Sequence, residues 1–314
     1  MSDIVPKIND IYDEPFADSS QIPTYLLCNF ASNFSKVALS GDGGDELFGG
    51  YNRYFYTENI WNKVKLIPNP LRKYFFKIIL HTPNSLFIFI QSIINIFFHN
   101  KELRLFSEKI KKLSRKIINS KDKKQLYISF LTEWNTEDIQ ITPDSLNYSE
   151  LFNKTKHENK SFTENMMLFD LITYLPNDIL TKVDRASMAN SLEVRAPFLS
   201  KELLDLSYSL PINNKIKGNK GKIILKKILN NYLPNELIDL PKQGFGIPLG
   251  DWINSSLNEW IFDNINTIKR KKQNFININV LLNNLKIHKE NNIDLSSKLW
   301  PAIIFCDWYN KNFK

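Results

Sequence analysis

"LSGDGGDELFGGY", residues 39–51, holds five of the ten glycines in this chain of 314 residues, together with the carboxylates of Asp42, Asp45 and Glu46. Glycines that follow a strand let backbone N–H groups approach an anion and let the chain adopt positive φ. Carboxylates in such a loop would repel a phosphate unless Mg²⁺ lay between them or one carboxylate acted as a base. The stretch therefore indicates either a phosphate and Mg²⁺ site or a tight turn with acidic residues at a helix N-terminus.

Composition describes an ordinary globular protein, with 43% hydrophobic, 24% charged and 13% aromatic residues. Cys28 and Cys306 are the only cysteines and lie far apart, which indicates a reducing compartment, so we expect a cytoplasmic protein. The longest apolar run, Leu86–Phe98, is broken by polar residues and is shorter than the roughly 20 residues of a membrane span. We expect it to pack against protein, and the amino-terminal sequence does not resemble a secretory signal.

The net charge of +8 raises the question of a nucleic-acid partner. The densest basic stretches are residues 109–124 and 269–272, and lysine is frequent throughout the chain. Such stretches are typical of solvated helix faces and loops. We therefore expect no nucleic-acid partner.

Three segments of the chain differ in composition and in hydrophobic pattern. Residues 1–53 contain a helical pattern from Ile22 to Phe34, a strand-like run at Lys36–Leu39 and the glycine-rich loop, which predict part of an α/β layer. Residues 54–163 are rich in Lys, Ile, Phe and Leu at helical spacing and predict a helical scaffold. Residues 164–314, in which polar motifs return, are predicted to complete the domain.

Other stretches accompany the glycine-rich loop: "YDEPFADSSQIPTY" (12–25), "LPNDILTKVDRASMANSLEVRAPFL" (175–199), "KGKIILKK" (220–227) and "PKQGFGIP" (241–248). In the first, Asp18, Ser19, Ser20 and Gln21 predict an N-cap cluster before a helix with Pro23 in its first turn. The last two place Lys222 and Lys242 in stretches that contain glycine, where lysines suit a departing pyrophosphate.

These stretches, in this order, resemble the synthetase half of the glutamine-hydrolysing asparagine synthases, which are pyrophosphatase-loop ATP enzymes. The resemblance implies an α/β, adenine-nucleotide alpha-hydrolase-like fold that is predominantly helical, with a partial parallel sheet. It also implies that ATP activates the side-chain carboxylate of aspartate as an acyl-adenylate and that ammonia, which can come from glutamine, then displaces AMP.

The resemblance assigns roles to individual residues. Asp45 corresponds to a Mg²⁺ ligand, and Asp42 to the carboxylate that assists the ammonia step. Lys222 and Lys242 are expected to hold the phosphates of ATP. The residues expected to shape the loop against the nucleotide or substrate are Ser40, Gly41, Gly43 and Gly44.

Arg195 has two open interpretations, a catalytic group or a structural ion pair with Glu193. For Asp184 and Arg185 we favour a partly buried structural pair that joins two helices. We expect surface or helix-cap positions for the four histidines, which are His81, His99, His157 and His288. We expect core positions for the tryptophans Trp252, Trp300 and Trp308. Ser200 departs from the family, which commonly has an acidic residue there.

Two family features are absent from these 314 residues, the first nucleotide loop Ser-Gly-Gly-x-Asp-Ser and the glutaminase nucleophile Cys after Met1, where Ser2 stands. Three hypotheses follow. The chain is a truncated asparagine synthase, or a half-enzyme that works with a second chain carrying the glutaminase domain and the first ATP loop and that amidates another carboxylate such as a sugar acid, or a non-enzymatic basic binding protein. We expect the isolated chain to be inactive. An incomplete sheet also predicts exposed apolar surface in the first fifty residues.

Overall fold

The computed structural model describes residues 2–83, 86–87, 106–134, 147–238, 244–271, 275–290 and 293–313. The chain divides into two compact units. Unit 1 comprises Met1–Tyr54, Trp134–Leu146 and Phe152–Lys314, and unit 2 comprises Phe55–Glu133 and Asn147–Leu151. The predicted boundaries at residues 53 and 163 remain predictions.

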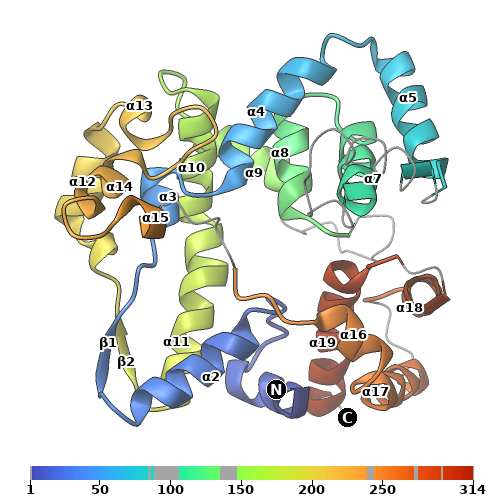
Figure 1. Ribbon diagram of the computed structural model, residues 1–314. Coiled ribbons are helices and arrows are strands. Elements are labelled where there is room, and N and C mark those ends of the chain that lie inside the picture. Colours follow the sequence, from blue (N-terminus) through green and yellow to red (C-terminus); the bar gives the residue numbers. More distant parts are fainter. Residues whose placement is uncertain are drawn as a thin grey trace. The chain divides into compact units, whose positions relative to one another are not determined.

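Helices dominate both units (Figure 1). Along the chain the elements are η1 (Ser2–Lys7), α1 (Ile8–Tyr12), α2 (Gln21–Ser32), β1 (Val37–Leu39), α3 (Gly44–Phe48), α4 (Asn52–Val64), α5 (Asn69–His81), α7 (Phe106–Ile118), α8 (Lys123–Leu131), α9 (Tyr148–Thr155), α10 (Phe162–Ile172), η3 (Leu175–Leu180), α11 (Thr181–Met188), β2 (Glu193–Arg195), η4 (Pro197–Leu199), α12 (Lys201–Ser209), α13 (Ile212–Lys215), α14 (Ile223–Leu229), α15 (Asn235–Ile238), α16 (Leu249–Asn254), α17 (Asn258–Arg270), α18 (Ile278–Glu290) and α19 (Ser296–Asn312).

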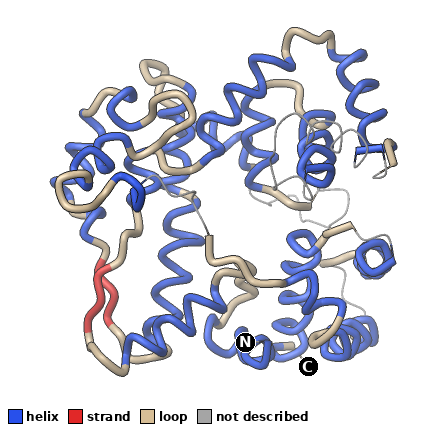
Figure 2. Tube along the Cα trace, viewed as in Figure 1, coloured by secondary structure: helices blue, strands red, loops and turns tan. Residues whose placement is uncertain are grey.

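The described residues form one small parallel sheet, in which β1 pairs with β2 and Ala38 lies opposite Val194 (Figure 2). The strand predicted at Lys36–Leu39 is confirmed, as is the parallel pairing. The second strand was not predicted, because its three residues alternate charged and apolar side chains within a stretch that we interpreted as a motif.

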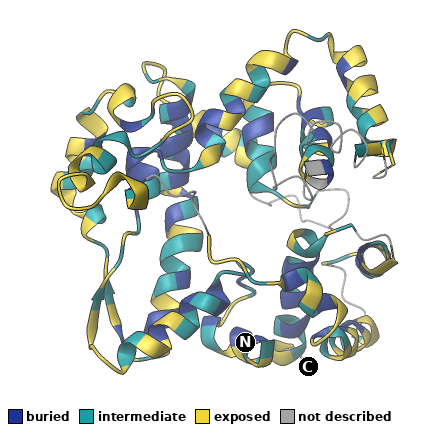
Figure 3. Cartoon of the chain, viewed as in Figure 1, coloured by how far each residue is buried: buried dark blue, intermediate teal, exposed yellow. Residues whose placement is uncertain are grey.

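Among the described residues, packing covers one face of this sheet. Ala38 and Val194 pack against a buried cluster of Cys28, Ala186 and Leu192 on α2, α11 and the turn after α11. Side chains in a strand alternate between faces, so the neighbours of Ala38 point the other way, and Leu39 is 73% exposed. The strands are largely exposed in Figure 3, and the predicted exposed apolar surface is confirmed.

The main core of unit 1 joins the two ends of the chain. Residues of η1, α1 and α2 pack with α16, α17, α18 and α19, and Trp300 is buried at its centre. The prediction for the tryptophans is confirmed for Trp300. Trp252 is partly buried against this core, whereas Trp308 lies at its margin and donates from Nε1 to the carbonyl of Asp13 at 3.0 Å.

The prediction that all four histidines are surface or cap residues is wrong for His288. This residue of α18 is 5% exposed. Its Nε2 lies 3.2 Å from the carbonyl oxygen of Gly250, and its Nδ1 accepts from the amide of Leu295 at 3.2 Å. A ring with a polar atom on each side can join two segments in a way that an apolar side chain cannot. His99 lies outside the described residues.

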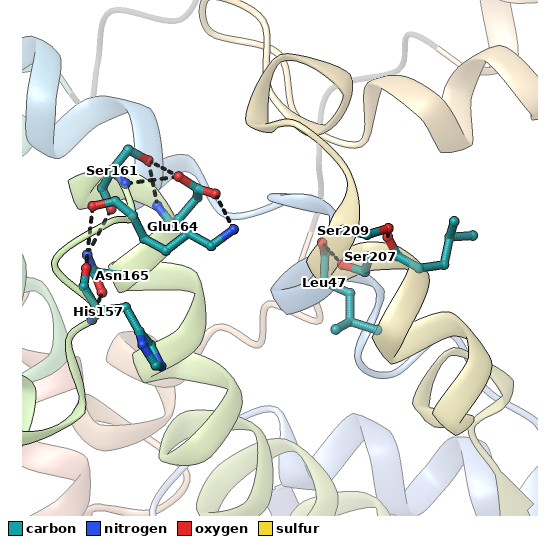
Figure 4. Close-up of polar contacts among 9 residues, drawn as sticks. Leu47, His157, Ser161, Glu164, Asn165, Ser207 and Ser209 are labelled. Carbon is teal, nitrogen blue, oxygen red and sulfur yellow. Dashed lines mark hydrogen bonds and ion pairs between the residues drawn. The ribbon is translucent and has the colours of Figure 1, made fainter.

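The starts of α10 and α12 follow local chemistry. Ser161 and Glu164 form a capping box at α10 (Figure 4). Ser200, the departure from the family, caps α12 by accepting from the amide of Leu203. The predicted cap of α2 is wrong in detail: Ser20 occupies the N-cap position and Pro23 the first turn, but the Ser20 hydroxyl makes no cap hydrogen bond.

Unit 2 has its own apolar cluster of Val64, Ile117 and Leu126. Its packing includes the guanidinium of Arg72, which lies 4.9 Å from the centre of the Trp61 ring. Most of the predicted segment Leu86–Phe98 lies outside the described residues. Among the residues that the structure describes, no helix combines the length and the apolar composition needed to cross a membrane.

Candidate functional site

The glycine-rich loop connects β1 to α3. The amide of Ser40 donates to the carbonyl of Arg195 at 2.8 Å, which extends the sheet pairing by one residue. The chain then turns through Gly43, whose φ of 83° would strain any residue with a side chain. This turn places Asp45 in the first turn of α3.

Lys222 reaches Asp45 from a segment far away in the sequence. Its Nζ lies 3.2 Å from Oδ1 of Asp45. Lys222 has a positive φ of 57°, which is uncommon for a residue with a side chain and is found mostly where surrounding structure enforces it. Its amide donates to the carbonyl of Phe48 at 2.9 Å, so backbone and side chain both hold this lysine against α3.

Close approach at this point requires glycine. A Cβ on Gly221 would lie 1.9 Å from the carbonyl oxygen of Gly49, and a Cβ on Gly50 would lie 1.9 Å from Oδ1 of Asp45. The first contact is with backbone and could be relieved only by backbone movement, whereas the second would displace the carboxylate of Asp45. The glycines that flank Asp45 and Lys222 in the sequence therefore bring the carboxylate and the ammonium together.

The other predicted site residues, apart from Lys242, belong to the same glycine-rich loop. Asp42 is half-buried in the same loop. Oγ of Ser40 is buried and has no hydrogen-bond partner among the described residues, and a Cβ on Gly41 would meet open space. Gly44 packs against the ring of Phe198. Lys242 lies outside the described residues, so its convergence on the site remains a prediction.

This arrangement fits a Mg²⁺ and phosphate ligand. Mg²⁺ commonly binds through one or two carboxylates and takes its other ligands from phosphates and water. Asp45 supplies such a carboxylate, and Lys222 supplies a cation of the kind that binds phosphate. The same loop also holds the partnerless hydroxyl of Ser40 and the open side of Gly41.

A buried polar cluster that the sequence analysis missed continues from α3. Glu46 accepts a hydrogen bond of 2.7 Å from the hydroxyl of Tyr51, and burial raises the pKa of Glu46 above its usual range. Arg53 lies 4.1 Å from the centre of the Tyr51 ring and 4.6 Å from that of Tyr174, and donates to the fully buried Asp170 at 2.9 Å. The sequence signal was the pair of tyrosines and the arginine in "YNRY" after the glycines.

A second missed group links the segments 12–25 and 175–199. Oδ2 of Asp18 accepts from Nζ of Lys182 and from Oγ of Ser20, both at 2.6 Å. The hydroxyl of Ser20 is therefore used here and not at the helix cap. Asp178 lies one helical turn before Lys182, and burial together with the charge of Asp18 raises its pKa to about 7.

Three charged residues do not join these groups. The predicted partly buried pair of Asp184 and Arg185 is wrong: both are exposed on α11, and Arg185 instead lies 3.7 Å from Asp13. Side chains of adjacent helical residues diverge, which prevents their pairing. Arg195 forms a 2.8 Å ion pair with Glu193, and both side chains are more than half exposed.

Comparison with known proteins identifies the family. The asparagine synthase family model matches residues 1–310. The chain is 31% identical over 313 residues to asparagine synthetase [glutamine-hydrolyzing] 1 of Bacillus subtilis (strain 168), a match that covers 99% of this chain and 46% of the relative. It is 27% identical over 308 residues to a putative asparagine synthetase [glutamine-hydrolyzing] of Mycobacterium tuberculosis (strain ATCC 25618 / H37Rv), covering 97% and 44%.

A putative asparagine synthetase [glutamine-hydrolyzing] 2 of Methanocaldococcus jannaschii is 30% identical over 204 residues, which cover 62% of this chain and 34% of that protein. No solved structure gives a significant match. The chain spans about half the length of the first curated relatives it matches. Because the family model covers nearly all of the sequence, the chain belongs to the asparagine synthase family.

Proposed function

We propose that this chain contributes the synthetase site of an ATP-dependent amidation of aspartate, on an adenine-nucleotide alpha-hydrolase-like fold. An oxygen of the aspartate side-chain carboxylate attacks the α-phosphorus of ATP, pyrophosphate leaves, and ammonia then displaces AMP from the acyl-adenylate. The observation that carries the proposal is the contact of Lys222 with Asp45 of the glycine-rich stretch, which also holds the partnerless hydroxyl of Ser40. Family membership supports ATP use.

Each residue has a role within this proposal. Asp45 holds Mg²⁺, which when bound neutralises charge on the phosphates. Lys222 and Lys242 bind the departing pyrophosphate, and Asp42 accepts a proton from the attacking ammonia. The residues that bind the nucleotide through backbone and hydroxyl groups are Ser40, Gly41, Gly43 and Gly44.

The test measures incorporation of labelled pyrophosphate into ATP in the presence of Mg²⁺ and aspartate. The 314 residues contain no Ser-Gly-Gly-x-Asp-Ser segment, so the chain is assayed alone and mixed with the amino-terminal part of the Bacillus subtilis relative. We expect the chain alone to exchange no faster than its Asp45→Ala variant, because a whole cluster of phosphate donors is missing. We expect exchange in the mixture.

Variants of this chain, assayed in the same mixture, then test which residues form the site. Asp45→Ala and Lys222→Met should each lower exchange by about a hundredfold or more, the usual order for removing one transition-state contact. Their effect on stability should be small, because a half-exposed ion pair contributes at most about 1 kcal/mol. Lys217→Met changes an exposed lysine of the same segment and serves as the control. Exchange that is insensitive to Asp45 and Lys222 would refute the proposal.

A further inference from the structure

The positive charge of the chain is concentrated in unit 2. This unit holds 15 lysines and arginines against 6 aspartates and glutamates, a formal charge of +9, whereas the whole chain carries +8. Unit 1 is therefore close to neutral. The imbalance is strongest over residues 59–83, which contain five lysines and arginines and no acidic side chain. Charge of one sign on one compact unit favours an anionic partner.

The inner face of α5, which lies in this stretch, is used for packing within unit 2. The helix contacts α7, and Phe76 lies against the apolar cluster of the unit. The guanidinium of Arg72, a buried residue, donates to the carbonyl of Ser120 at 3.1 Å. Because side chains three or four residues apart share a helix face, these contacts define which face of α5 is left for solvent.

The outer face of α5 is apolar and exposed. Leu71 is 61% exposed and Tyr74 is 68% exposed, and about half of Phe75 and of Ile78 is exposed as well. Positions three, four and seven residues after Leu71 lie on its side of the helix, so the four side chains form one apolar stripe. Figure 3 shows α5 as largely exposed. A contiguous apolar stripe on a surface is typical of a docking site.

Two lysines border the apolar stripe. Lys73 and Lys77 lie one turn apart on α5, and both are exposed. At about 3.6 residues per turn they fall between the packed face and the stripe. The structure records no ion pair between either lysine and another described residue. Lysine side chains can lie along an apolar surface while their ammonium groups stay in water, and this combination is typical of helices that lie in the interface of an anionic bilayer.

We propose that α5 docks on an anionic lipid surface, with the apolar stripe in the headgroup boundary and with Lys73 and Lys77 at the lipid phosphates. A second copy of the same face fits less well, because two units of charge +9 would repel each other. Nucleic acid would match the charge, but the aliphatic side chains of Leu71 and Ile78 offer no ring on which a base could stack. A lipid surface matches both features.

The probe is a vesicle of phosphatidylglycerol and phosphatidylcholine in equal parts, compared with a vesicle of phosphatidylcholine alone. Flotation of the full chain on a density gradient, against lipid concentration, separates bound protein from aggregates. We expect binding to the anionic vesicle and weak or no binding to the neutral one. Binding should weaken as salt rises from about 0.1 to about 1 M, because the Debye length falls from about 10 to about 3 Å.

A charge variant tests the lysines. Lys73→Gln combined with Lys77→Gln should weaken binding to the anionic vesicle by about tenfold or more, because each lysine near an anionic surface contributes roughly fivefold. The matched control is Lys286→Gln combined with Lys289→Gln, which removes two exposed lysines of α18 in unit 1. This control should bind as the wild type does.

A second variant tests the apolar stripe and keeps both lysines. Tyr74→Ser combined with Ile78→Ser should also weaken binding by about tenfold or more, because less apolar area enters the headgroup boundary. Leu206→Ser combined with Tyr232→Ser removes exposed apolar side chains of unit 1 and should leave binding unchanged. Circular dichroism confirms that each variant is folded.

Three results would overturn the proposal. The first is equal binding to the anionic and neutral vesicles. The second is unchanged binding by both double variants of α5. The third is binding of a single-stranded RNA oligonucleotide that depends on Lys73 and Lys77 when the anionic vesicle does not bind, since the surface would then be a nucleic-acid site.

Discussion

At the scale of single residues, Asp178 carries an ionisation that opposes folding. Its pKa is raised to about 7 from an ordinary value of 3.8, so the native state keeps a proton that the unfolded chain releases as pH rises between these values. Stability therefore falls through this window and stays reduced above pH 7. The positive charge of Lys182 lowers the pKa of Asp178 and so offsets part of this loss of stability.

We predict that Asp178→Asn is more stable than the wild type by about 2 kcal/mol at pH 8 and that this difference nearly disappears at pH 4. Urea denaturation at both pH values measures it. Asp184→Asn, an exposed position on the next helix, should show no such pH-dependent gain. A destabilised Asp178→Asn protein at pH 8 would contradict the assigned direction.

Glycines in the candidate site have unequal structural roles. Gly221→Ala should cost more than about 2 kcal/mol, because its Cβ would collide with the backbone oxygen of Gly49. Gly41→Ala meets open space and should change stability by less than about 0.5 kcal/mol. Thermal unfolding distinguishes the two. Similar melting temperatures for the two variants would show that the approach of Gly221 to Gly49 is not as close as described.

At the scale of elements, His288 connects α18 to α16 and to the segment before α19. Its ring nitrogens lie near the carbonyls of Gly250 and Ile293, and Nδ1 accepts from Leu295. A buried carbonyl or amide left without its partner costs about 1–3 kcal/mol.

We predict that His288→Phe lowers the free energy of unfolding by about 2 kcal/mol, although phenylalanine has a similar shape. Chemical denaturation gives the value. His81→Phe is the matched control, since that ring is exposed at the end of α5 and lies 2.8 Å from the carbonyl of Lys77 in its own helix. Equal effects of the two substitutions would argue against His288 as a connection between helices.

At the scale of the whole molecule, exposed apolar side chains on α2, on the turn after it and on β1 are the main exposed apolar feature that we describe in unit 1. Leu27 and Phe30 lie one turn apart on α2, the ring of Phe34 lies 5.0 Å from that of Phe30, and Leu39 is exposed on β1. Adjacent exposed apolar side chains promote association.

We predict that Phe34→Ser combined with Leu39→Thr raises the concentration at which the chain aggregates by about twofold or more and leaves its stability nearly unchanged. Light scattering against concentration measures this. Leu66→Ser removes an equally exposed leucine of unit 2 and should have no effect. Unchanged aggregation in the double variant would show that the exposed side chains of Phe34 and Leu39 do not drive association.

The sequence by itself determined the family, the strand at Lys36–Leu39, the helix after Ser20 and the glycine-rich loop with Asp45, because these depend on local patterns and on motifs in a fixed order. Tertiary structure alone decided that Lys222 contacts Asp45, that Asp18 binds Lys182 and that His288 is buried. It also decided that Arg185 pairs with Asp13 and not with Asp184. Each of these contacts joins residues from different elements, and their pairing depends on how helices pack, which no local spacing encodes.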